Sequence, residues 1–217
     1  MMDHMEYILN ILPFILSGLK LTAKIYVATL VIALPLGLLA AIGKVSGSQF
    51  IKKVLFLYTW IWRGTPLLLQ LFFMFYGLPV IGIRLSPFAA ATITYALNYG
   101  AYLTEIFRGG IESIDKGQYE AAKALGMSYA QTMRRIIIPQ TVRRVLPTTC
   151  SEAVNLVKDT ALLAVLGMPD LLRIATQIFT RDFNITPFVV AFVLYLIISS
   201  VLVKLFGKLE KMYSIYE

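Results

Sequence analysis

The chain has few of the residues that most often carry chemistry: its 217 residues include one cysteine, Cys150, and one histidine, His4. A single cysteine excludes a disulfide framework, and these two residues cannot together form a cysteine–histidine metal cluster. No nucleophile–base pair is visible, because the only histidine lies at the N-terminus. The sequence therefore favours a chain with no metal site and no catalytic residue of its own.

Charged residues are also scarce. Asp, Glu, Lys and Arg make up 15% of the chain, hydrophobic residues make up 58%, and the mean hydropathy is +0.74. Several apolar runs approach or exceed the ~20 residues that a helix needs to cross a ~30 Å hydrocarbon core. A soluble helical bundle is the alternative, but each helix of such a bundle needs a polar face. We expect an all-α, polytopic membrane protein with a single transmembrane domain over residues 1–217.

Five membrane spans are expected from the apolar runs and their flanking Gly, Pro and charged residues. The second span carries Pro66, which predicts a kink. Two shorter amphipathic helices are expected outside these spans, at residues 5–16 and 169–179. The expected spans are residues 18–42, 54–80, 87–107, 139–166 and 187–205.

Basic residues in the connections predict the orientation of these spans. One side collects thirteen Lys and Arg residues, and the other collects five. Because Lys and Arg gather on the cytoplasmic side, we expect the N-terminus outside and the C-terminus in the cytoplasm. The net charge of +8 is then explained by a membrane surface, and no nucleic-acid partner is expected.

The polar stretch 112–138 between the third and fourth spans is expected to form a stiff cytoplasmic loop. Strong helix formers precede Gly126, which permits the left-handed conformation that ends a helix. Ser128 is suited to cap a second short helix, and Pro139 predicts a turn before the fourth span. The apolar side chains of this loop suit docking onto another protein, but equally suit a helix lying on lipid headgroups.

Residues with a defined spacing decide between these two readings. They follow the order E-A-A, three residues, G, nine residues, I-x-I-P, and are Glu120, Ala121, Ala122, Gly126, Ile136, Ile138 and Pro139. This order resembles the EAA loop of ATP-binding cassette (ABC) importer permeases, in which Leu stands at the position of Ile138. Further stretches resemble the polar amino-acid branch of the type I permeases (histidine, glutamate, glutamine, arginine and opine transporters), with Thr104 as a local departure. These are 63-RGTPLLLQL-71, 99-YGAYLTEIFRGGI-111, 158-KDTALL-163 and 167-GMPDL-171.

The resemblance implies that residues 113–127 form a coupling helix that docks into a groove of a separate ATPase subunit. The docking residues it implies are Glu120, Ala121, Ala122, Leu125 and Gly126. It also implies two ATPase copies, a second permease chain (a copy or a paralogue), an extracellular or periplasmic solute-binding protein, and a multi-pass location in a prokaryotic inner membrane. ATP and Mg would be bound by the ATPase, since the phosphate-loop lookalike 37-GLLAAIGKV-45 has the wrong glycine spacing and lacks the needed Ser or Thr.

Polar side chains at membrane depth are the candidates for a cargo site. Arg63, Asn98 and Glu152 each lie eight to ten residues from the basic cytoplasmic edge, which is roughly 12–15 Å along a helix. A charge at that depth needs a partner or a cavity. Spacings of three or four residues place Tyr102 on the same helix face as Asn98, and Asn155 and Asp159 on the same face as Glu152. The candidate substrate-binding residues are therefore Arg63, Asn98, Tyr102, Glu152, Asn155 and Asp159.

These residues suit a zwitterionic amino acid: Arg63 and Asn98 are the expected donors to its carboxylate, and Glu152 or Asp159 is the expected acceptor for its ammonium group. Two carboxylates on the fourth span favour arginine, lysine or histidine as cargo, while glutamine and glutamate remain the alternative. The same residues also suit structural interhelical contacts, such as a pair between Arg63 and Glu152. An autonomous channel or secondary carrier is the alternative function, and it would need no ATPase and no protruding loop.

Overall fold

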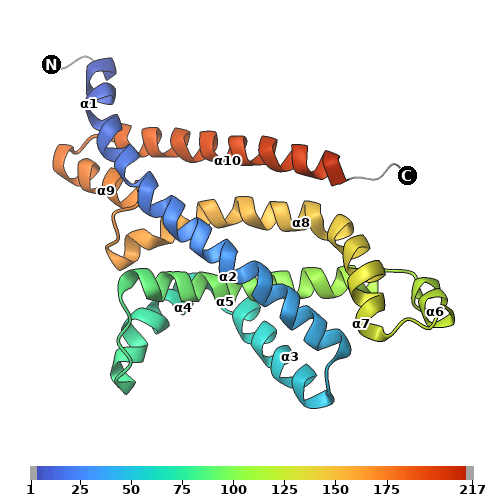
Figure 1. Cartoon of the computed structure of the whole chain (residues 1–217). Coiled ribbons are helices and arrows are strands. Elements are labelled where there is room, and N and C mark those ends of the chain that lie inside the picture. The colour runs from blue at the N-terminus through green and yellow to red at the C-terminus, as the bar shows by residue number, and fades with distance from the viewer. Residues whose placement is uncertain (1–3, 214–217) are drawn as a thin grey trace.

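The computed structural model describes residues 4–213, and these residues form helices without any β-strand (Figure 1). The ends at 1–3 and 214–217, which the expected domain includes, lie outside the described residues. Short π-helical segments cover Phe73–Gly77 and Met133–Ile137, and 3₁₀ segments cover Leu78–Ile81 and Thr160–Leu166. The α-helices are α1 (His4–Ser17), α2 (Leu19–Ser46), α3 (Gln49–Gly64), α4 (Leu67–Phe72), α5 (Pro87–Glu112), α6 (Lys116–Ala124), α7 (Tyr129–Thr132), α8 (Ile138–Asp159), α9 (Leu171–Asp182) and α10 (Thr186–Tyr213).

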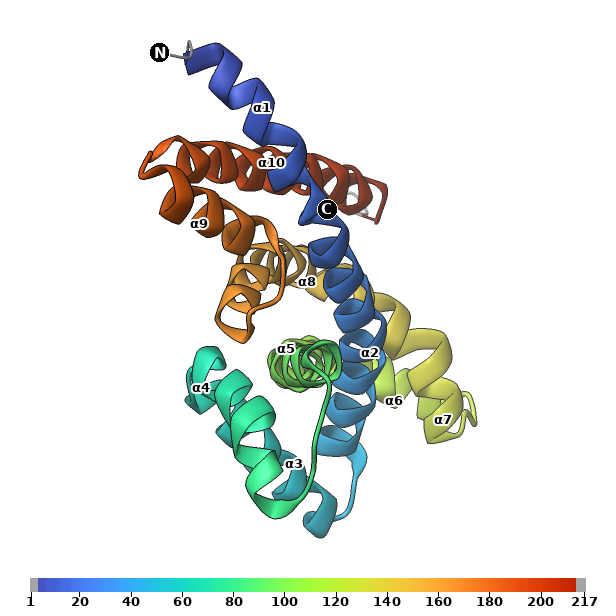
Figure 2. The same cartoon turned by 90° about the vertical axis from the view of Figure 1, so that its left-hand side faces the viewer.

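Helix α5 lies at the centre of the bundle. Figure 2 shows it end-on, with α2, α3, α4 and α8 arranged around it, and it packs against each of these four helices. Small residues permit the close approach: a Cβ on Gly37 of α2 would lie 2.6 Å from Leu103 Cβ, and a Cβ on Gly100 would lie 2.8 Å from Leu36 Cδ2. Small residues at helix crossings are how membrane helices gain packing contacts without a hydrophobic driving force.

The length and composition of the helices bear on the expected spans. In the described part of the chain, residues 4–46 and Thr186–Tyr213 are long and apolar enough to cross a membrane. Two bent helix pairs raise this number to four if each counts as one span. Helix α5 is not among them, because it carries Tyr, Thr and Gly residues that are buried against other helices. A helix surrounded by protein does not need a lipid-compatible surface, so its sequence is less apolar than that of α10.

The segment expected as one kinked span, 54–80, consists of two helices that meet at 106°. Thr65 is extended, with φ −121° and ψ 148°, and Pro66 then begins α4. A residue before proline is pushed toward the extended region, and proline supplies no backbone donor to continue the helix. The proline was correctly taken as the site of the bend, but the angle is far larger than that of a kinked helix.

Helix α1, expected as an amphipathic helix outside the spans, packs against protein. Ile11 and Ile15 are buried in a cluster with residues of α9 and α10, including Leu171, Ala175 and Val190. Helix α9 confirms the amphipathic helix expected near 169–179, and its Asp170 cap accepts hydrogen bonds from two backbone N–H groups. The short helices α1 and α9 therefore form a second apolar cluster beside the main core.

The loop between α5 and α8 has the expected two helices meeting at Gly126. This glycine has φ +75°, and Met127 N donates to Ala122 O at 3.0 Å, which closes α6 in a Schellman motif. Ser128 caps α7 through a reciprocal capping box with Gln131. The loop is therefore ordered by hydrogen bonds within its own sequence.

The turn expected at Pro139 is absent. The chain stays helical from Tyr129 to Leu166, with the π-helical segment Met133–Ile137 directly before α8. Pro139 lies in the first turn of α8, where a missing N–H costs least. The extra residue of the π segment shifts the hydrogen-bond ladder, so the proline is accommodated without a break.

The crossing of α5 and α8 yields a stability prediction. A Cβ on Gly110 would lie 2.2 Å from Val145 Cγ1, whereas a Cβ on the neighbouring Gly109 would meet nothing within 4 Å. We expect Gly110→Ala to cost about 1–3 kcal/mol by overpacking, and so to lower the melting temperature of the purified chain by roughly 3–10 °C. Gly109→Ala is the matched control and should raise stability slightly, because alanine favours a helix. Equal melting temperatures for the two variants would contradict this close packing.

Candidate functional site

The stripe of polar residues on α8 faces a cavity of about 610 Å³. Glu152, Asn155 and Asp159 line it from α8, and Asn98 and Tyr102 line it from α5. Helical spacing of four and three residues placed each set on one face, and the crossing of α5 with α8 brings the two faces together. The structure therefore joins five of the six predicted substrate-binding residues around one space.

Arg63 lies at the boundary of this cavity. Its guanidinium carbon is 5.3 Å from the centroid of the Tyr102 ring, a cation–π distance. The side chain lines a neighbouring cavity, which is described below. Within residues 4–213, no ion pair joins Arg63 to Glu152, so the structural pair considered from the sequence is not formed.

Asn98 makes structural contacts between helices, the alternative that the sequence left open for the candidate residues. Its amide group donates to Trp62 O and to Gln70 Oε1, both at 2.9 Å. Gln70 in turn donates to Trp62 O at 2.9 Å and to Thr65 O at 3.1 Å. These bonds hold the bend between α3 and α4. The donors that Asn98 was expected to offer a cargo carboxylate are therefore already used.

Asp159 is held by two tyrosines of α5. Its carboxylate accepts a hydrogen bond from Tyr99 Oη at 2.6 Å, and its backbone oxygen accepts one from Tyr95 Oη at 2.8 Å. Both donors are neutral, so Tyr99 orients the carboxylate without neutralising it, and Tyr95 fixes the backbone beside it. Sequence reasoning missed Tyr99, although Tyr95, Tyr99 and Tyr102 have the spacing of one helix face.

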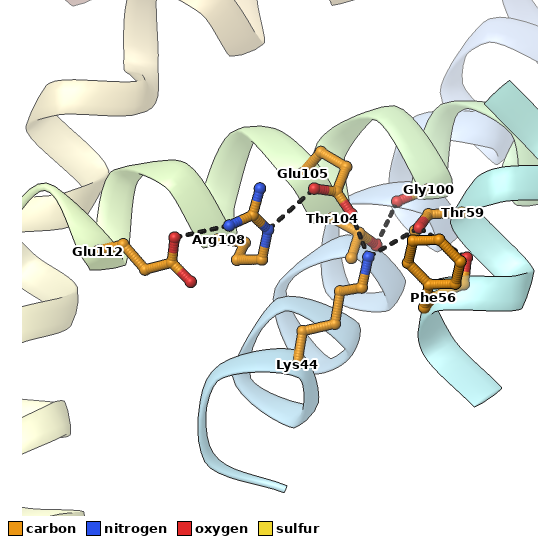
Figure 3. A network of polar contacts seen from close by, with 8 residues as sticks. All are labelled: Lys44, Phe56, Thr59, Gly100, Thr104, Glu105, Arg108 and Glu112. Carbon is orange, nitrogen blue, oxygen red and sulfur yellow. Dashed lines mark hydrogen bonds and ion pairs between the residues drawn. The ribbon is translucent and has the colours of Figure 1, made fainter. Parts of the chain in front are cut away.

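Glu105 shares a helix face with Asn98 and Tyr102, but it belongs to a separate network (Figure 3). Its carboxylate is paired with Lys44 of α2 and, at 2.9 Å, with Arg108 of α5. Lys44 also donates to Thr59 of α3 at 2.7 Å, and Arg108 reaches Glu112 at 2.6 Å. The Lys44 and Glu105 side chains are only 10% and 15% exposed, so the network joins α2, α3 and α5 at a partly buried point.

A second cavity of about 700 Å³ lies beside this network and has the opposite charge character. Its ionisable lining consists of one acid, Glu105, and five bases: Lys44, Lys52, Lys53, Arg63 and Arg108. The two cavities thus differ in sign, and Arg63 and Tyr102 stand between them. Of these two cavities, the one between α5 and α8 is the one that favours a cation.

The predicted docking residues lie on α6 and at its end. The loop of α6 and α7 projects from one end of the bundle, the end toward which α10 runs (Figure 1). Glu120, Ala121, Leu125 and Gly126 are exposed, and Leu125 is 79% exposed. Ala122 is fully buried, so its side chain seats α6 on the rest of the chain and is not available to a partner. Burial raises the pKa of Tyr119 in the same helix, with nearby Tyr129 adding to the shift.

Comparison with known proteins agrees with this architecture. Residues 33–211 match the family described as binding-protein-dependent transport system inner membrane component. An arginine transport system permease protein of Bacillus subtilis (strain 168) is 38% identical over 193 residues, which is 88% of each chain. The glutamine transport system permease protein of Escherichia coli (strain K12) is 36% identical over 203 residues, or 92% of this chain and 93% of that one.

Solved structures show the same fold. An amino acid ABC transporter crystallised with histidines gives a TM-score of 0.89 at 34% identity and covers 98% of this chain and 100% of that one. An inward-facing methionine ABC transporter, at 17% identity and a TM-score of 0.76, is similar in fold alone. The chain belongs to the family of binding-protein-dependent transport system inner membrane components, in the amino-acid branch that the sequence indicated. It is thus a non-catalytic, membrane-embedded permease subunit of an ABC transporter.

Proposed function

We propose that this chain forms the translocation pathway of an ATP-driven uptake system for basic amino acids. The observation that carries this proposal is the pair of carboxylates, Glu152 and Asp159, at one cavity between α5 and α8. A cationic side chain and an α-ammonium group both need such acceptors. Tyr102 adds an aromatic face beside them.

The cargo carboxylate needs a donor, and Arg63 is the proposed one. Asn98, the other predicted donor, is engaged with Trp62 and Gln70. Arg63 lies over Tyr102 at the edge of the cavity and has no ion pair among the described residues. Asn155, which also lines the cavity, supplies a neutral amide. The proposed substrate-binding set is therefore Arg63, Tyr102, Glu152, Asn155 and Asp159.

Glutamine is the second candidate cargo, for a specific reason. Lys158 lines the same cavity as Glu152 and Asp159, and a lysine there lowers the net negative charge that a cation would meet. Relatives named for glutamine transport are as similar to this chain as the relative named for arginine transport. A neutral polar side chain would use Asn155 and one carboxylate.

The proposed assembly has two permease chains, two ATPase subunits and a solute-binding protein in the inner membrane of a bacterium. Five spans, with the N-terminus outside, place the α6 loop on the cytoplasmic side with most of the basic residues. The arrangement of helices is consistent with this orientation, because the N-terminal end of α1 and the C-terminal end of α10 lie toward opposite ends of the molecule (Figure 1). ATP and Mg would be bound by the ATPase partner.

Docking of the ATPase is proposed to involve α6 through Glu120, Ala121, Leu125 and Gly126. Leu125 is the exposed apolar residue expected to enter a groove on the partner. Burying such a side chain contributes about 1.5–3 kcal/mol, so Leu125→Ser should weaken copurification of the co-encoded ATPase by about tenfold or more.

Val80→Ser is the control for this experiment. Val80 is 84% exposed and belongs to the short helix Leu78–Ile81, at the end of the bundle away from α6 (Figure 1). Val80→Ser removes an apolar side chain of similar exposure. Because Val80 lies away from α6, this variant should leave ATPase binding unchanged. Undiminished binding by Leu125→Ser would place the ATPase contact elsewhere.

The choice of cargo is tested at Glu152. Glu152→Gln keeps the shape of the side chain and removes its charge, and a hydrogen bond to a charged group contributes about 1.5–3 kcal/mol. We expect the KM for arginine uptake into proteoliposomes to rise by about tenfold or more, with a smaller change for glutamine. Glu6→Gln, at an exposed position on α1, is the control. If arginine, lysine and histidine uptake were all unchanged, Glu152 would not contact the cargo.

A further inference from the structure

The α6 loop is attached to the bundle by a small number of polar contacts. Ser46 at the end of α2 is hydrogen-bonded to Tyr129 at the start of α7, and Gln140 donates weakly to Gln118 at 3.3 Å. The third contact comes from Arg144 of α8. Its Nη1 donates to the backbone oxygen of Ser113 and, at 3.0 Å, to Ser113 Oγ.

Ser113 occupies a position of mechanical importance. It caps the C-terminal end of α5 and is separated from α6 by only Ile114 and Asp115. Ile114 is 4% exposed, and Asp115 caps α6 by accepting from Gly117 N at 2.7 Å. The segment between Ser113 and α6 is therefore short and held at both ends. A displacement of α6 should for this reason also move Ser113.

Arg144 lies next to a close contact between α8 and α5. The adjacent Val145 is 7% exposed and meets Gly110 of α5 at a distance that excludes any side chain on that glycine. Along the same helix, Glu152 lies eight residues further, which is about 12 Å. Helix α8 therefore has a contact to the docking loop near one end and the cavity carboxylates toward the other.

We propose that Arg144 is a positioning residue that couples α6 to α8, so that movement of the docked ATPase reaches Glu152, Asn155 and Asp159. This inference rests on the proposed function and adds a residue through which the coupling passes. Arginine suits the task because its planar guanidinium reaches a carbonyl and a hydroxyl at once and stays charged. Arg144 is not among the residues that line the cavity, and its hydrogen bonds in the described part of the chain go to Ser113, so its role differs from that of the cargo and docking residues.

Arg143 provides a matched control. It is also an exposed arginine in α8, one position earlier, and none of the hydrogen bonds or ion pairs found in residues 4–213 involves it. Arg143→Ala and Arg144→Ala therefore change charge and helix propensity equally. Among the hydrogen bonds and ion pairs of the described residues, they differ only in the contact to Ser113.

The test uses the complex of this chain with its co-encoded ATPase, reconstituted in liposomes with the solute-binding protein. Three quantities are measured for each variant: ATPase copurification, ATP hydrolysis, and amino acid taken up per ATP hydrolysed. For Arg144→Ala we expect normal copurification, continued hydrolysis, and a ratio that falls roughly three- to tenfold, the range for loss of one ordinary intramolecular hydrogen bond at an exposed position. Arg143→Ala should keep the wild-type ratio.

Two milder variants keep the proposal testable if Arg144→Ala does not fold. Arg144→Lys retains one donor, and Ser113→Ala retains the backbone acceptor, so both should give intermediate ratios. Equal ratios for the Arg143 and Arg144 variants would overturn the inference, as would loss of ATPase copurification in Arg144→Ala alone. Failure of the unaltered chain to bind the ATPase would instead overturn the proposed function.

Discussion

The cost of an unpartnered charge at membrane depth governs where the polar side chains of this chain lie. Most such groups are bonded to one another. Glu105 forms ion pairs with Lys44 and Arg108, and Asn98 donates hydrogen bonds to Gln70 and to Trp62 at the bend between α3 and α4. These contacts link α2, α3, α4 and α5 into one body. In the described part of the chain, Glu152 and Lys158 have no ion pair, and both line the cavity between α5 and α8. We propose that these two charged groups, which both line the cavity, mark the place where a polar cargo enters.

Helix α8 connects this cavity to the loop that is proposed to receive the ATPase. Toward one end it carries the cavity residues, and toward the other Arg144 contacts Ser113 beside α6. Close packing of Val145 on Gly110 makes the junction of α5 and α8 resistant to deformation. A movement imposed on α6 is then passed into the helix that holds the carboxylates. The basic cavity beside Arg63 lies outside this connection, and the contact of Arg63 with Tyr102 separates it from the cavity between α5 and α8.

Features set by neighbouring residues were predictable from the sequence. The two helices meeting at Gly126, the Ser128 cap and the amphipathic helix α9 follow from local propensity, and the α8 stripe follows from helical spacing. Features set by distant residues were not. The 106° bend depends on Gln70 and Asn98, which are 28 residues apart, and the Lys44–Glu105 pair spans 61 residues. The burial of Ala122 depends on packing against the rest of the chain, which the local sequence does not show. The continuous helix at Pro139 depends on the π-helical segment before it, which the local sequence does not show either.

The central claim is that the carboxylates of Glu152 and Asp159 on α8 hold the cargo while the basic cavity does not. The most direct measurement is a structure of the assembled transporter determined with saturating arginine and, separately, with glutamine. The account predicts an arginine molecule whose ammonium or guanidinium group lies within hydrogen-bonding distance of Glu152 or Asp159. An arginine bound among Lys52, Lys53 and Arg63, or a cavity between α5 and α8 that stays empty at saturation, would contradict it.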